Sequence, residues 1–184
     1  MVNIIHDFIH EYDFLYDHIL SPFKENLIDE FFDRRNKEGD HITDILLDGE
    51  IEEFKKIELG LSKIVEENYF VGNKFASGGI RAYVQNNQNS TQILHNHVNL
   101  KGSICAVFYL NIPKQGGEIL FRDLENSEWG SEVTIKPKLN KVYLFPYWLP
   151  HVPLPQQDTT SRICFNWMYG SIQRPVHKFY LTQW

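Results

Sequence analysis

The sequence has little cysteine and no long apolar run. Its two cysteines, Cys105 and Cys164, each lie within an apolar strand-like segment, which favours buried reduced thiols over a disulfide scaffold. No uninterrupted apolar segment approaches the roughly 20 residues of a membrane-spanning helix. The N-terminus carries acidic and histidine residues where a signal peptide would have a basic region and an apolar core. We therefore expect a soluble, cytoplasmic protein that does not enter a membrane.

Positive charge is also scarce. Lys and Arg total 18 against 24 Asp and Glu, which gives a formal net charge of −6, whereas nucleic-acid backbones are bound by clustered basic side chains. This balance makes nucleic acid an unlikely main partner. The hydrophobic content of 42% over 184 residues is typical of a globular chain with one core. We expect a single domain over residues 1–184, with helical support in 1–68 and a β-rich core in 69–184.

Two regions of the chain differ in their hydrophobic spacing. Before about residue 68 the spacing is mostly helical: Ser21-Pro22 predicts a helix start, a loop follows from Arg34 to Asp40, and a second helix runs from about Asp48 to Glu67. From Tyr69 onward, short apolar runs alternate with polar turns, which predicts roughly six to eight antiparallel strands. This order indicates a mainly β fold with N-terminal helices, a jelly roll or double-stranded β-helix buttressed by helices.

Two histidines one residue apart, His95 and His97, lie in a strand-like stretch. Successive side chains of a strand point to opposite faces, so these two imidazoles project to the same side and can converge on one ion. A third histidine, His151, lies in a proline-rich passage, and Arg162 opens another strand-like run soon after it. This pattern is typical of a mononuclear metal site inside a β-barrel. The alternative is that the histidines are ordinary polar residues of a strand.

The last strand-like run separates by alternation into two faces. One face is fully apolar and should meet the helices; it comprises Ile163, Phe165 and Trp167. The other face begins with Arg162 and Cys164, so it should line the cavity, where a buried guanidinium needs an anion and suits a carboxylate. Tyr109, on an earlier strand, can present its hydroxyl to the same anion. A structural polar pair of Tyr109 and Arg162 is the alternative.

Several motifs occur together in a fixed order. They are His95-Asn96-His97, Val107-Phe108-Tyr109-Leu110-Asn111, Gly116-Gly117-Glu118-Ile119-Leu120-Phe121, Leu144-Phe145-Pro146 with His151, and Arg162 with its strand. As a set they resemble the core of the Fe(II)/2-oxoglutarate-dependent dioxygenases, in particular the 2-oxoglutarate–Fe(II) oxygenases of bacteria and phages, and more distantly the prolyl hydroxylases. The likeness covers about residues 80 to 170.

The resemblance implies a double-stranded β-helix in which His95, His97 and His151 hold one Fe(II). Arg162 and Tyr109 would hold the distal carboxylate of 2-oxoglutarate, and Cys164 would either line the cosubstrate pocket or serve as a small buried hydrophobe. The implied reaction uses O2 to convert 2-oxoglutarate into succinate and CO2 while a substrate C–H bond is hydroxylated. The substrate stays open between a protein residue, a free amino acid, a nucleotide and a small metabolite.

The chain departs from the commonest pattern of these enzymes at two positions. Most of them have a carboxylate as second ligand where this chain has His97, and the nearby carboxylates of Glu118 and Asp123 lack the spacing of a partner to His95. Imidazole ligands also suit Zn(II), Ni(II) and Cu(II). Cys164 replaces a common serine. A three-histidine cupin-type metalloenzyme that does not use 2-oxoglutarate and a non-catalytic jelly-roll binding protein are the alternative readings.

Loops around the barrel mouth would select the substrate. The expected loops are Tyr69 to Gly79, Asp123 to Gly130 with Trp129, and Tyr147-Trp148-Leu149. Aromatic side chains at a mouth can stack on a substrate. Trp148 could equally shield the metal from bulk water.

Overall fold

The computed structural model describes residues 2–6, 8–38, 42–46, 52–70, 75–85, 93–98, 102–123 and 131–171. In chain order, the elements are β1 (Val2–His6), β2 (Ile9–Asp13), α1 (Asp17–Leu20), the 3-10 turn η1 (Ser21–Phe23), α2 (Lys24–Glu38), β3 (Ile42–Leu46), α3 (Glu52–Asn68), β4 (Phe75–Gln85), β5 (Ser103–Asn111), β6 (Ile119–Asp123), β7 (Ser131–Ile135), β8 (Lys141–Pro146), β9 (His151–Pro153) and β10 (Arg162–Ser171). Across these ranges, every helix is too short or too polar to cross a membrane.

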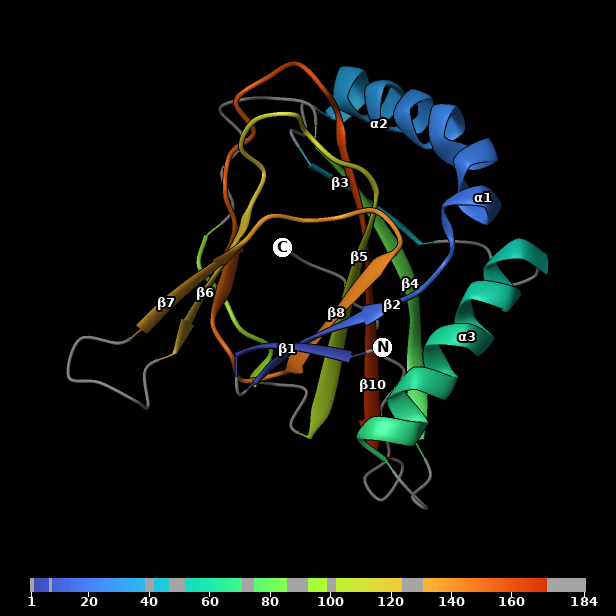
Figure 1. Cartoon of the computed structure of the whole chain (residues 1–184). Coiled ribbons are helices and arrows are strands. Elements are labelled where there is room, and N and C mark those ends of the chain that lie inside the picture. Colours follow the sequence, from blue (N-terminus) through green and yellow to red (C-terminus); the bar gives the residue numbers. More distant parts are fainter. Residues whose placement is uncertain are drawn as a thin grey trace.

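The strands form two antiparallel sheets. The larger sheet has seven strands in the order β1-β2-β8-β5-β10-β4-β3, and the smaller has three in the order β7-β6-β9. In Figure 1 the smaller sheet lies to the left of the larger sheet, and the helices lie to the right of the larger sheet. This arrangement is the jelly roll that the strand pattern predicts, with helices packed against the outside of one sheet.

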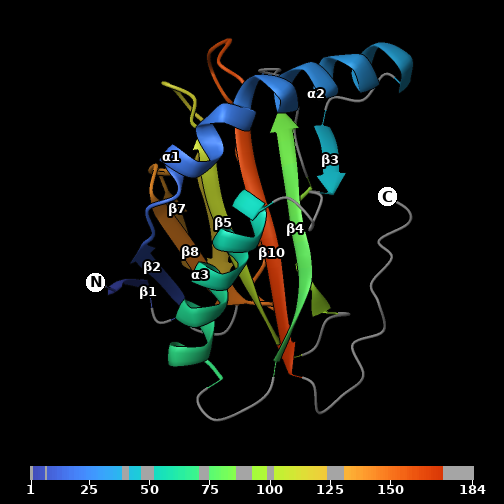
Figure 2. The ribbon, with the colours of Figure 1, turned by 90° about the vertical axis from the view of Figure 1, so that its right-hand side faces the viewer.

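The larger sheet buries both of its faces. The helix-facing side carries large apolar residues that are almost fully buried, among them Phe108, Leu144, Phe165 and Trp167. Figure 2 shows α1 and α3 in front of this face, with α2 across its upper end. The opposite side packs a second apolar cluster that includes Cys105, Tyr109, Phe145 and Cys164. The predicted division of β10 into a helix-facing apolar row and a cavity-facing mixed row is therefore confirmed.

The helices follow from their apolar spacing. The buried residues of α3 are Phe54, Ile57, Leu61 and Val65, which recur every three or four positions and so form one stripe facing the sheet. Ser21 and Pro22 begin the turn η1, which leads directly into α2. The expected loop from Arg34 to Asp40 is wrong over residues 34–38, because α2 continues to Glu38, and residues 39–40 lie outside the described part of the chain. Four of the residues 34–38 are Arg, Lys or Glu, which are good helix formers, and Gly39 after them disfavours helix strongly.

The first third of the chain contributes strands as well as helices. The hairpin of β1 and β2 extends the larger sheet beside β8, and β3 covers its other edge beside β4. A strand expected around His95 is reduced to a single antiparallel bridge between His95 and His151. That bridge joins the segment before β5 to the start of β9.

Candidate active site

Backbone pairing brings the three predicted ligands together. The His95 N–H donates to the His151 carbonyl at 3.1 Å, and the His151 N–H donates to the His95 carbonyl at 2.8 Å. Two residues later, the His97 N–H donates to the carbonyl of Tyr147 at 2.7 Å. The segment that carries the histidine pair therefore runs alongside the approach to β9. This pairing is the reason that ligands distant in sequence become neighbours.

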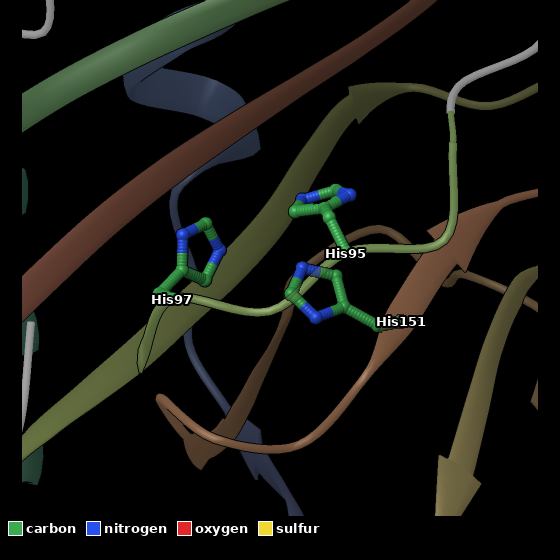
Figure 3. A group of neighbouring side chains, drawn as sticks. All are labelled: His95, His97 and His151. Atoms are coloured by element: carbon green, nitrogen blue, oxygen red, sulfur yellow. The ribbon is translucent and has the colours of Figure 1, made fainter. Parts of the chain in front are cut away.

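The three imidazoles converge. One nitrogen from each of His95, His97 and His151 lies within 4.8 Å of the others, and Figure 3 shows the three rings turned toward one another. The ring centroids of His95 and His151 are 4.5 Å apart, and each is 5.2 Å from the centroid of His97. In the part of the chain that the structure describes, this is the one cluster of three or more potential metal-binding side chains.

Two of the rings are held by hydrogen bonds. His95 Nδ1 lies 2.9 Å from the carbonyl oxygen of Ile93, and His151 Nδ1 lies 3.0 Å from that of Leu149. A carbonyl only accepts, so each Nδ1 carries the proton and each Nε2 keeps its lone pair for a metal. The His97 ring makes no such bond within the described residues. The sequence held no signal for Ile93 and Leu149, because their contribution is a backbone carbonyl.

Burial keeps two of the three imidazoles, those of His97 and His151, uncharged. The pKa of His151 is lowered to about 3, mainly by desolvation and secondarily by the nearby His95. The pKa of His97 is lowered to about 4 by the same two causes in the same order. The aromatic rings of Phe121 and Phe145 contribute to this environment, with centroids 5.9 Å and 4.8 Å from that of His151. Both imidazoles are therefore neutral at pH 7, which is the form that binds a metal.

Arg162 forms the second part of the site. It is the first residue of β10 and is only 1% exposed, and its Nε and Nη1 atoms have no hydrogen-bond partner among the described residues. Cys164, two residues along on the same face, pairs in register with Tyr109 of β5. Burial is the main cause that raises the pKa of the Tyr109 hydroxyl, and the positive charge of Arg162 partly opposes it. The three predicted cosubstrate residues therefore share the face of the larger sheet that is turned away from the helices.

These residues fit a metal together with a small diacid. Three neutral imidazoles suit first-row divalent cations, including Fe(II), and a set of three protein ligands leaves coordination positions open. The buried guanidinium must meet an anion, because an unpaired charge in the interior is costly. Its planar fork matches a carboxylate, which it can bind through two parallel hydrogen bonds.

A comparison with protein families agrees with this chemistry. The model of a family described as "Putative 2OG-Fe(II) oxygenase" matches residues 83–167, a range that contains all six predicted site residues. The matched range is just under half of the chain, and over it the chain is similar to the Fe(II)/2-oxoglutarate-dependent dioxygenases. Together with the three converging imidazoles, this match indicates an oxygenase of the class that uses Fe(II), 2-oxoglutarate and O2. Among curated proteins, no sequence matches it.

Several solved structures have a similar fold. A Trichoplax adhaerens prolyl hydroxylase, in complex with a hypoxia-inducible-factor peptide, aligns with a TM-score of 0.70 at 13% identity over 91% of this chain and 86% of that one. A Pseudomonas putida prolyl-4-hydroxylase aligns with a TM-score of 0.62 at 16% identity over 88% and 92%. HygX from Streptomyces hygroscopicus, with nickel and 2-oxoglutarate bound, aligns with a TM-score of 0.65 at 12% identity over 89% of this chain and 83% of that one. These likenesses support the jelly-roll fold.

The remaining residues considered for the site are a nearby carboxylate and the aromatic residues of the expected mouth loops. The Glu118 carboxylate lies 3.7 Å from the Lys136 ammonium and is not part of the imidazole cluster. Trp148 packs edge-on against Phe8, with ring centroids 4.8 Å apart. Trp129 and most of its loop lie outside the described residues, as do residues 71–74 of another expected mouth loop.

Proposed function

We propose that this oxygenase holds Fe(II) through His95, His97 and His151 and the distal carboxylate of 2-oxoglutarate through Arg162 and Tyr109. We further propose that it hydroxylates a C–H bond of its substrate. The observation that carries the proposal is the combination of three converging imidazoles with a buried guanidinium whose Nε and Nη1 atoms have no partner among the described residues. A three-histidine metalloenzyme that binds no diacid would not account for that guanidinium.

The residues of the chain would divide the work between them. Bound Fe(II) and 2-oxoglutarate together supply the capacity to activate O2, with release of succinate and CO2. The imidazoles provide three neutral nitrogen donors on rigid backbone. Arg162 orients the diacid by its far end, and the Tyr109 hydroxyl adds a hydrogen bond to the same carboxylate. Phe121 and Phe145 exclude water from one side of the His151 ring, which strengthens electrostatic interactions there.

The neutral donor set has a consequence for the cosubstrate. With His97 in place of the more common carboxylate, the metal and its protein ligands carry one more unit of positive charge. That extra charge should favour the dianionic form of 2-oxoglutarate. It should also leave the site able to bind Zn(II), Ni(II) and Cu(II), so the assay must be made with protein loaded with Fe(II) without oxygen.

Succinate release from 2-oxoglutarate tests the proposal. Fe(II)-loaded protein exposed to O2 should form succinate slowly without a substrate, and a chelator should stop it. His151→Ala should abolish the reaction, while His18→Ala, which removes an exposed histidine of α1, should not change it. If the wild-type protein binds Fe(II) but neither binds 2-oxoglutarate nor forms succinate, the proposed function is wrong.

We also propose a cytoplasmic location. Cys105 and Cys164 are both free and buried, which is the usual state of thiols in a reducing compartment. Fractionation of the native host followed by immunodetection checks the proposal. Recovery of the protein outside the cytoplasm would contradict it.

A further inference from the structure

Tyr16 lies outside the candidate active site, but its hydroxyl bonds to the backbone of Tyr109, one of the predicted cosubstrate residues. This residue lies just before α1, it is 0% exposed, and its ring packs on Phe108 with centroids 4.9 Å apart. Its hydroxyl donates to the Tyr109 carbonyl at 2.6 Å and accepts from the Tyr109 N–H at 3.0 Å. One hydroxyl therefore satisfies both backbone groups of a single residue of β5, from the face of the sheet opposite the cavity.

The β5 strand needs this support at that position. On one side, the pairing of β5 with β8 ends at Phe108, which pairs with Val142. On the other side, the register between β5 and β10 shifts between Ile163 and Cys164, next to the pair of Cys164 with Tyr109. Tyr109 thus lies where the ladder ends on one side and is irregular on the other. Just beyond the last β5–β8 pair, the Tyr16 hydroxyl bonds to the Tyr109 backbone, and it also lies 3.4 Å from the carbonyl oxygen of Lys141 at the start of β8.

Tyr16 is itself held firmly. Its backbone N–H donates to Asn140 Oδ1 at 3.1 Å, and the N–H of Asp17 donates to the same oxygen at 3.0 Å. Asn140 has a φ of 56° and lies just before β8. The hydroxyl therefore reaches Tyr109 from a backbone that is fixed to the start of β8, where the ladder with β5 ends.

We propose that Tyr16 is a positioning residue for the cosubstrate clamp, acting through the backbone of Tyr109. The inference rests on the proposed role of Tyr109 in binding the distal carboxylate of 2-oxoglutarate. Without the hydroxyl, the N–H and carbonyl of Tyr109 would be buried without partners, which is costly enough to make the backbone move toward other partners. The phenol on the cavity side would move with it. The histidine segment and β9 would stay in place, because none of the hydrogen bonds and ring contacts of Tyr16 among the described residues joins it to either.

The test compares two hydroxyl deletions. Tyr16→Phe keeps the packed ring and removes the two bonds to Tyr109 together with the longer contact to the Lys141 carbonyl. The control, Tyr69→Phe, removes the hydroxyl that lies 2.7 Å from His10 Nδ1 and leaves β5 untouched. In anaerobic titrations of Fe(II)-loaded protein, Tyr16→Phe should weaken 2-oxoglutarate binding about tenfold. Its affinity for the metal, and for pyruvate, a 2-oxoacid without a distal carboxylate, should stay within about twofold, and the control should match wild type.

Hydrogen exchange and a double variant separate positioning from general loosening. The Tyr109 amide should exchange faster in Tyr16→Phe, while amides of β6 and β9 keep their wild-type rates. In a Tyr109→Phe background, Tyr16→Phe should cause little further loss of 2-oxoglutarate affinity, because its effect passes through that phenol. If Tyr16→Phe does not fold, Asn140→Gly removes the acceptor that holds Tyr16 and keeps the positive φ. It should produce the same selective loss to a smaller extent.

Contrary results identify which idea fails. If Tyr16→Phe binds 2-oxoglutarate as tightly as wild type does, the positioning role is wrong and the proposed function stands. The positioning role is also wrong if 2-oxoglutarate and pyruvate lose affinity equally, or if the loss persists in the Tyr109→Phe background. If wild-type protein does not bind 2-oxoglutarate at all, the proposed function itself fails.

Discussion

Residues with the same chemistry are held differently in this site. His95 and His151 each have a ring fixed by a carbonyl two residues earlier, whereas the His97 ring has no such bond within the described residues. A hydrogen bond to the second ring nitrogen fixes the tautomer and the orientation of a ligand. The three imidazoles should therefore contribute unequally to metal binding, even though their chemical groups are identical.

Single alanine substitutions at the ligands should reveal this order. We expect His151→Ala to weaken Fe(II) binding roughly tenfold to a hundredfold more than His97→Ala does, because only His151 is a ligand oriented by a hydrogen bond to its second ring nitrogen. Calorimetric titration without oxygen measures both affinities. Equal losses for the two variants would show that the carbonyl bond to His151 does not matter for binding.

Arg162 should affect the cosubstrate and not the metal. Arg162→Ala removes the buried cation that the distal carboxylate needs, and loss of one partner of a buried charge pair commonly costs about 2–5 kcal/mol. That range corresponds to a loss of 2-oxoglutarate affinity of about thirtyfold or more, with Fe(II) affinity nearly unchanged. Parallel titrations with Fe(II) and 2-oxoglutarate check the division of roles. A similar loss of both affinities would contradict it.

The helices stabilise the sheet that carries the site. On α3, Leu61 is 0% exposed and Leu59 is 74% exposed, so two leucines on one helix form a matched pair. Leu61→Ala should lower the free energy of unfolding by about 2–5 kcal/mol, the usual cost of a buried cavity. Leu59→Ala should change it by less than about 0.5 kcal/mol. Urea unfolding followed by circular dichroism gives both values. Equal effects would mean that α3 does not pack as described.

The sequence predicts elements whose spacing is regular. The α3 stripe and the alternation of β10 follow from the periods of helix and strand, and the turn between β5 and β6 follows from its proline and glycines. The β3 strand and the pairing of His95 with His151 do not, because an edge strand and a single bridge leave no periodic pattern. Tyr16 could not be found either, since its partner Tyr109 is distant in sequence and contributes only backbone groups.

At the scale of the molecule, the site residues were the more predictable part. The histidine pair, His151 and Arg162 carry recognisable chemistry in a fixed order, and the structure brings the three imidazoles together. How deeply the site residues are buried could not be predicted from the sequence to the same degree. Their burial depends on the apolar face shared by β5, β8 and β10, which forms only when distant strands pair.

Burial of uncharged histidines should make stability depend on pH. On folding, the pKa of His97 falls from 6.5 to about 4 and that of His151 falls from 6.5 to about 3. At a pH between the unfolded and the folded pKa of each histidine, the unfolded chain therefore binds more protons than the folded protein does. The contribution of the two histidines to stability is therefore complete above about pH 6.5 and declines as the pH falls toward the folded pKa values. Urea unfolding of metal-free protein at pH 7, 6 and 5 should show this decline.

Two variants test the source of that decline. His97→Gln should reduce the pH dependence of the free energy of unfolding, while His18→Gln, at an exposed position, should leave it unchanged. An unchanged slope in His97→Gln would place the pH dependence at other groups.

A crystal structure of the protein with Fe(II) and 2-oxoglutarate, prepared without oxygen, tests the central claim most directly. It should show one metal bound by nitrogens of residues 95, 97 and 151, with the 2-oxoacid end of the cosubstrate on the same metal and the distal carboxylate against the guanidinium of residue 162. A metal bound by carboxylates instead, or a cosubstrate whose far end points away from that guanidinium, would contradict the account.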